Sequence, residues 1–248
     1  MTMSLLLPLV MAPPPASWSG TPKWVPDRAV TASVRTVFHN VDVALTPSSA
    51  TYKVKTLFKY TGTKPAKGRI IVPVIGDGGD IEFFKTEIAA TWGGRTVTRR
   101  GLYADPNVES RWSNWWYFEV AFQPGEWKSF ESTLTRPLPK GGMDHVERLV
   151  RFKVFDTGDT LEQFQFSVKY PKGLVFHTVS TSPDSGWQVG ERGAFWKRDD
   201  WRPADDLLIE FRFYPGTFER IGGRFSVGTL ACRSFLPSAL PDQFVGHG

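Results

Sequence analysis

Cysteine is almost missing from this chain. Among 248 residues the only one is Cys232, which excludes an internal disulfide and a metal cage built from several thiolates. A lone cysteine usually packs as a small hydrophobic residue. Exported bacterial proteins often lack cysteine, so its scarcity assigns no cellular compartment.

Long apolar runs and runs of like charge are missing as well. No segment approaches the ~18 consecutive apolar residues of a membrane-spanning helix. The 30 basic and 25 acidic residues give a net charge of +5, but they are spread thinly along the chain. A tail that binds nucleic acid or membranes has a run of about five or six like charges. We therefore expect no transmembrane span and no nucleic-acid partner.

Motifs of the common enzyme classes are scarce. The chain has no Gly-x-Ser-x-Gly segment and no phosphate-binding glycine loop. No metal-binding spacing surrounds its four histidines, which are His39, His145, His177 and His247.

One segment, Asp156-Thr157-Gly158, is similar to the catalytic loop of aspartic proteases. It occurs once, so such an enzyme would have to act as a dimer through Asp156. The next residue, Asp159, departs from the small residue that is usual there. The same four residues also suit a turn between strands.

Oxygen ligands for Ca²⁺ occur only in pairs. A calcium site needs about six to eight oxygens, which no pair supplies. The pairs are Asp77 with Asp80, Asp156 with Asp159, and Asp199 with Asp200. We expect no cofactor, and calcium is the alternative.

What the chain does contain is alternation of apolar and polar residues. From residue 28 onward the dominant period is two, clearest in 52–60, 118–122, 164–170 and 207–213. This is the period of a half-buried β-strand. Pro124-Gly125 suits a type II turn and Gly93-Gly94 suits a tight hairpin, whereas helix signals are almost absent. We predict an all-β protein, an antiparallel Ig-like sandwich built as one large or two tandem β units.

Proline and glycine between residues 137 and 142 indicate a boundary. We place one β-sandwich domain at 27–137, a second β unit at 143–218 and a C-terminal arm at 219–248. The alternative is that 137–142 is a crossover within one fold.

The N-terminal segment carries the one targeting signal. Residues 4–12 are apolar and about as long as the core of a signal peptide, and small residues follow within 13–17. The basic residues that normally precede such a core are missing. We expect residues 1–17 to be a signal peptide, which makes the protein periplasmic or extracellular; the alternative is a disordered arm.

Tryptophan is abundant, with ten residues. On a strand through 112–117, Trp115 and Tyr117 face one way and Trp116 the other, so both faces are core only if the strand lies between two layers. An exposed ring can stack on a sugar or a protein partner. The candidate binding residues are Trp112, Trp115, Tyr117, Trp187, Trp196 and Trp201. The alternative is that these rings fill the core.

Three sequence motifs follow one another along the chain in an order that is known from other proteins. They are an extended segment containing Val72-Pro73 (69–74), an aromatic strand with a Pro-Gly-Glu turn (116–128), and a closing strand introduced by aromatics, a polar pair and a proline (195–209). In this order the chain resembles a family of exported bacterial β-sandwich proteins for which no activity is established. The resemblance implies an extracytoplasmic sandwich and transfers no catalytic residue.

Together these patterns predict a non-catalytic binding or structural module of the cell envelope, with a protein or glycan partner. Two alternatives stay open. One is a carbohydrate-binding module that uses Trp112, Trp115 or Trp116, and the other is a dimeric aspartic-protease-like hydrolase that uses Asp156. β-Sandwiches support all three, so the predicted fold does not choose between them.

Overall fold

The computed structural model describes residues 17–27, 34–46, 48–73, 87–104, 114–138, 147–154, 158–170, 175–183, 185–190, 192–203 and 207–214. Within these ranges every regular element is a β-strand, so the predicted all-β class is confirmed. A search of the same ranges finds no helix with the length and apolar character needed to cross a membrane.

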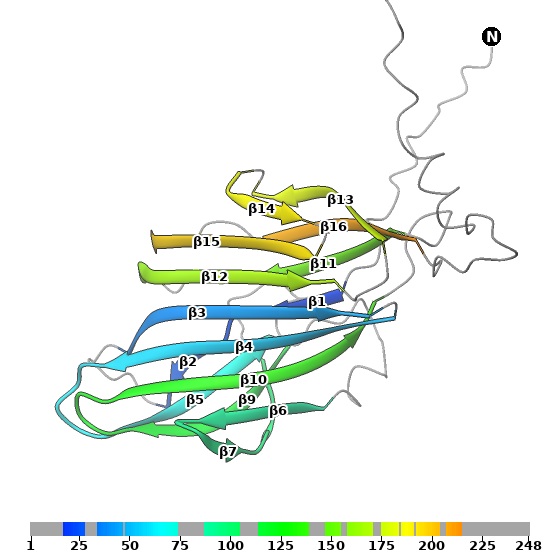
Figure 1. Cartoon of the computed structure of the whole chain (residues 1–248). Coiled ribbons are helices and arrows are strands. Elements are labelled where there is room, and N and C mark those ends of the chain that lie inside the picture. Colours follow the sequence, from blue (N-terminus) through cyan, green and yellow to red (C-terminus); the bar gives the residue numbers. More distant parts are fainter. Residues whose placement is uncertain are drawn as a thin grey trace, which may run out of the picture.

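The largest sheet has eight strands in the order β14-β15-β12-β3-β4-β10-β6-β7 (Figure 1). Neighbouring strands are antiparallel except β3 and β12, which are parallel. Their bounds are β3 Val34–Leu45, β4 Ser49–Tyr60, β6 Ile88–Trp92, β7 Arg95–Val97, β10 Trp127–Pro137, β12 Leu161–Lys169, β14 Trp187–Gly190 and β15 Gly193–Trp201.

The parallel pair joins distant parts of the chain in one sheet. Residues 163–169 of β12 pair in register with residues 38–44 of β3. Strands from both sides of the predicted boundary at 137–142 therefore share one sheet.

Two four-stranded sheets complete the sandwich. One has the order β1-β11-β16-β13 and the other the order β2-β5-β9-β8. The first comprises β1 Ser17–Gly20, β11 Glu147–Lys153, β16 Leu207–Tyr214 and β13 Val175–Ser182. The second comprises β2 Lys23–Pro26, β5 Ala66–Pro73, β9 Asn114–Phe122 and β8 Gly101–Ala104. In Figure 1 the small sheets lie behind the large one.

Strand β4 shows that both small sheets cover the same face of the large sheet. Its residues Tyr52 and Val54 belong to a core shared with β11, whereas Phe58 and Tyr60 belong to a second core shared with β5 and β9. All four are even-numbered residues of one unbroken strand, and alternate residues of a strand share a face. The odd-numbered residues point to the opposite side, termed the outer face below, which neither small sheet covers.

The two turns predicted from glycine have the expected geometry. Gly93 and Gly94 have φ angles of 55° and 79° between β6 and β7. Gly125 has a φ of 69°, and the backbone N–H of Glu126 donates to the carbonyl of Gln123 over 3.1 Å. Positive φ strains residues with a Cβ, which explains glycine at these positions.

Candidate functional site

Hydrogen-bonding side chains gather on the outer face where β12 and β15 lie side by side. Burial of Phe164, Phe166 and Val168 turns the intervening β12 residues outward, because successive side chains of a strand point to opposite faces. Across to β15, the register places Gln165 opposite Lys197 and Gln163 opposite Asp199.

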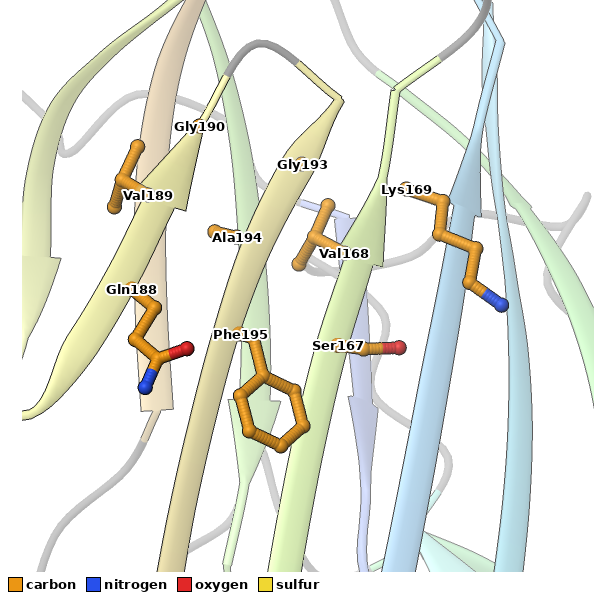
Figure 2. A pocket seen from close by; sticks show the side chains of 9 residues that line it. All are labelled: Ser167, Val168, Lys169, Gln188, Val189, Gly190, Gly193, Ala194 and Phe195. Carbon is orange, nitrogen blue, oxygen red and sulfur yellow. The ribbon is translucent and has the colours of Figure 1, made fainter.

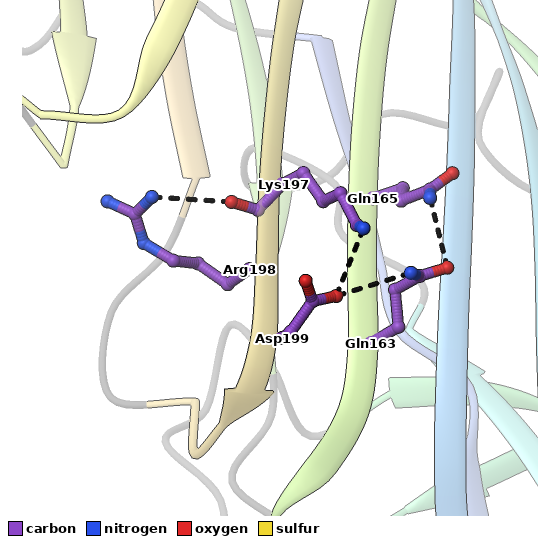
Figure 3. Close-up of polar contacts among 5 residues, drawn as sticks. All are labelled: Gln163, Gln165, Lys197, Arg198 and Asp199. Carbon is purple, nitrogen blue, oxygen red and sulfur yellow. Dashed lines mark hydrogen bonds and ion pairs between the residues drawn. The ribbon is translucent and has the colours of Figure 1, made fainter.

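These four side chains form one network (Figure 3). Nε2 of Gln165 donates to Oε1 of Gln163 over 2.9 Å, and Nε2 of Gln163 donates to Oδ1 of Asp199 over 3.2 Å. Nζ of Lys197 lies 3.2 Å from the same carboxylate oxygen. The hydrogen bond from Gln163, followed by that from Lys197, lowers the pKa of Asp199. The network therefore presents an ionised acceptor beside ammonium and amide donors.

An aromatic ring and a hollow adjoin the network. Phe195 of β15 is half-buried, opposite Ser167 of β12 and Gln188 of β14. Beside it is a shallow, open hollow of about 400 Å³. Its lining comes from β12, β14 and β15 (Figure 2): Ser167, Val168, Lys169, Gln188, Val189, Gly190, Gly193, Ala194 and Phe195.

Glycine at position 193 lets β15 approach β12 closely at this hollow. Gly193 has a φ of 153°, and a Cβ built there would lie 2.0 Å from the carbonyl oxygen of Val168. Any other residue would push the strands apart at this point. The shape of the hollow therefore depends on the absence of a side chain at Gly193.

On the other side of β12, Asp42 of β3 continues the polar surface. The hydroxyl of Ser167 donates to Oδ1 of Asp42, and Nζ of Lys169 lies 4.0 Å from the same oxygen. Nδ2 of Asn40 lies 3.4 Å from Oδ2 and donates to it. Polar side chains thus occupy three neighbouring strands, with Lys197, Gln165 and Asn40 side by side in the register. The hollow, Phe195 and the network of Gln163, Gln165, Lys197 and Asp199 are together termed the β12–β15 site.

Trp115 and Trp196, two of the residues predicted to bind, lie in the interior. Trp115 is 0 % exposed and its neighbour Trp116 is 2 % exposed, so β9 is enclosed on both faces at this point. Trp196 is 1 % exposed and donates from Nε1 to the carbonyl of Ser185 over 3.1 Å. Neither Trp115 nor Trp196 has a ring face open to a ligand, so core filling, the alternative given above, describes both.

The other predicted aromatic residues differ in their surroundings. Trp187 and Trp201 are half-buried and pack against the same core as Trp196, with the Trp201 ring 5.0 Å from the Trp196 ring. Tyr117 is half-buried on the β2-β5-β9-β8 sheet, with the guanidinium of Arg69 5.4 Å from its ring centre. Trp112 lies outside the described residues.

Asp156, the aspartate of the alternative protease interpretation, also lies outside the described residues, as do Asp77 and Asp80. Asp159 accepts a hydrogen bond from the backbone N–H of Thr36 over 2.9 Å, which ties Asp159 to β3. Across the described ranges, no group of three or more His, Cys, Asp or Glu side chains is arranged to hold a metal ion.

The sequence interpretation missed the β12–β15 site. It assigned Gln165 and Ser167 correctly to the polar side of their strand, but that pattern says nothing about which strands lie beside β12. Phe195 was overlooked in favour of the adjacent Trp196. The signal that could have found it is the alternation along β15, which turns these two rings to opposite faces.

Comparisons with known proteins bear on the fold. No family model matches this sequence, and no curated protein matches it. Among solved structures, a protein of Legionella pneumophila named "putative nutrient binding protein" is similar over 78 % of this chain and 70 % of its own, with 14 % identity and a TM-score of 0.55. The similarity is one of fold.

An M1 zinc metallopeptidase from Deinococcus radiodurans is similar over 71 % of this chain, with 10 % identity and a TM-score of 0.40. This chain spans 42 % of the length of that peptidase. A similarity this weak supports no conclusion about activity.

Proposed function

We propose that this protein is a non-catalytic, extracytoplasmic binding module of the bacterial cell envelope whose ligand is of the sugar class and binds at the β12–β15 site. The observation that carries the proposal is the position of this site on the face of the large sheet that neither small sheet covers. Export is proposed from the apolar segment at residues 4–12 and the family resemblance described above.

The chemistry of the site matches that of a sugar. A sugar ring has a face of C–H groups and a rim of hydroxyls that both donate and accept hydrogen bonds. The exposed part of the Phe195 ring can pack against the first. Gln165 and Lys197, which lie opposite each other two residues along their strands from the Ser167–Phe195 pair, can form hydrogen bonds with the second. Hydrogen bonds to charged groups are the stronger ones, which favours Lys197 as the anchor beside Phe195.

The network also holds its side chains in place before a ligand arrives. Gln163 contacts both Gln165 and Asp199, and Lys197 contacts Asp199 as well. Ordering a free side chain on binding costs about 0.5–1.5 kcal/mol, so a preformed network reduces that loss. The name of the similar Legionella protein is compatible with a binding function and is the only support that the comparisons add.

We expect Phe195→Ala to weaken sugar binding at least tenfold, equivalent to about 1.4 kcal/mol, because the variant loses the apolar contact. Monosaccharides, disaccharides and amino acids are first screened by the shift in melting temperature. Each compound that raises it is then titrated by calorimetry into the wild type and the variant.

The matched control for this experiment is Tyr117→Ala, which removes a half-buried aromatic ring from the β2-β5-β9-β8 sheet. It should bind like the wild type. The proposal is wrong if no sugar binds, or if Phe195→Ala binds the sugar as tightly as the wild type does. Circular dichroism establishes that both variants are folded.

A further inference from the structure

Apolar side chains on the outer face continue beyond the β12–β15 site. Phe38 of β3 lies beside Gln163 of β12 and directly opposite Leu57 of β4. Leu57 in turn lies opposite Ser129 of β10, two residues from Trp127. Because alternate residues share a face, Phe38, Leu57 and Trp127 are all on the outer face with Phe195.

These four side chains form a diagonal line across the sheet. From Phe195 to Phe38 the line crosses two strand spacings and moves four residues along the strands. From Phe38 to Leu57 it crosses one more strand spacing. From Leu57 to Trp127 it crosses another strand spacing and moves two residues further in the same direction. With ~4.8 Å between strands and ~3.3 Å per residue, the line is about 25–30 Å long. That length exceeds a single sugar ring several times over.

Trp127 is the far end of the line and carries an exposed aromatic ring. It is 47 % exposed, and Nζ of Lys59 lies 4.7 Å from its ring centre. The cation rests against the indole from the neighbouring strand and leaves much of the ring open. Phe38 and Leu57, between the two ends, are half-buried, so part of each apolar side chain is exposed on the outer face.

Charged groups along the line are largely paired with each other. Arg35 lies 3.7 Å from Glu162, and Lys55 lies 2.9 Å from Glu131. At the other end, Lys197 pairs with Asp199 and Lys169 with Asp42. A surface whose charges are already paired gains little from a charged partner, but its paired groups still accept and donate hydrogen bonds to hydroxyls.

We infer that the ligand is a neutral, linear glycan chain that lies along this diagonal, with one end at the β12–β15 site and the other on Trp127. The inference rests on the proposed function and extends it from a sugar to a polymer. Each further sugar unit of an extended glycan can contact another apolar side chain of the line. The affinity for the glycan therefore rises with its length until it reaches Trp127.

The test titrates maltooligosaccharides and chitooligosaccharides of one to six units into the wild type, Phe195→Ala, Trp127→Ala and Trp127→Phe, by calorimetry. For the wild type we expect at least a tenfold gain in affinity between two and six units for one of the two series. Trp127→Ala should lose that gain and keep its affinity for the shortest ligand that binds. Trp127→Phe should keep most of the gain, because a ring is retained.

Failure of this inference is distinguishable from failure of the proposed function. Binding that depends on Phe195 but does not strengthen with chain length overturns the inference and leaves the proposed function intact. A loss of affinity in Trp127→Ala that is equal for all lengths overturns the inference too. If no ligand of any length binds in a Phe195-dependent way, both are wrong.

Discussion

Acidification from pH 7.5 to pH 5 is expected to lower the free energy of unfolding by about 2 kcal/mol through one residue, His39. The side chain is 2 % exposed, its Nδ1 lies 2.8 Å from Oγ1 of Thr56, and its ring meets Phe164 edge to face. Burial lowers the pKa of His39 from 6.5 to about 3. The imidazole is therefore neutral in the folded protein at neutral pH.

The sign of the effect follows from which state binds the proton. Below about pH 6.5 the unfolded chain protonates this histidine, whereas the folded protein does so only near pH 3. The unfolded state thus binds more protons, and stability falls by up to about 1.4 kcal/mol per pH unit as the pH drops through this window. Above the unfolded pKa the contribution is complete and independent of pH.

Urea denaturation followed by circular dichroism at pH 7.5, 6.5, 5.5 and 5 measures this slope, above the range where most carboxylates titrate. The control is the double variant His39→Leu/Thr56→Val, which removes the imidazole together with the hydroxyl that would otherwise lose its partner. Its stability should be nearly constant over the same range. An unchanged slope in the double variant would assign the effect to other groups.

Replacement of Trp196 by alanine is expected to cost about 3–5 kcal/mol of stability, the usual cost of truncating a buried aromatic residue. The indole packs at 5.8 Å from the Phe164 ring and 5.0 Å from the Trp201 ring, and its N–H donates to Ser185. All of these contacts are lost in Trp196→Ala. A domain is typically stable by about 5–15 kcal/mol, so the loss is a large fraction of the total.

The matched control is Trp127→Ala, which removes a tryptophan side chain from an exposed position. We expect it to cost less than about 1 kcal/mol, because the ring is 47 % exposed. Both variants are measured by urea denaturation at pH 7.5. Equal costs for the two would contradict the assignment of Trp196 to the core.

The sequence predicted the strands and turns because both signals are local. Alternation in 164–170 and glycine at 93, 94 and 125 correspond to features seen in β12 and in two tight turns. The β12–β15 site was harder to predict from the sequence. It depends on which face of its strand each residue occupies and on which residues of neighbouring strands pair. Phe195, which faces outward, and Trp196, which faces the core, are consecutive residues. The sequence interpretation chose the larger ring, Trp196, as the candidate binding residue.

Strand β3 illustrates the second difficulty. Its register with β4 shifts between Thr36 and Phe38, so Val37 is an extra residue and the alternation changes phase there. A strict period of two would put Phe38 on the same face as Thr36, which is buried. The bulge turns Phe38 outward instead. A single sequence does not mark such a position.

The parallel pairing of β3 with β12 has a consequence for the order in which the chain folds. Asp42 and Ser167, which meet across this pair, are 125 residues apart in the sequence. Contacts of such high sequence separation slow folding, because a long loop must close before they form. Until β12 is available, one edge of β3 has no neighbouring strand to hydrogen-bond to, and open edges invite pairing between molecules. We therefore expect chains truncated before β12 to aggregate rather than to fold as a smaller sandwich.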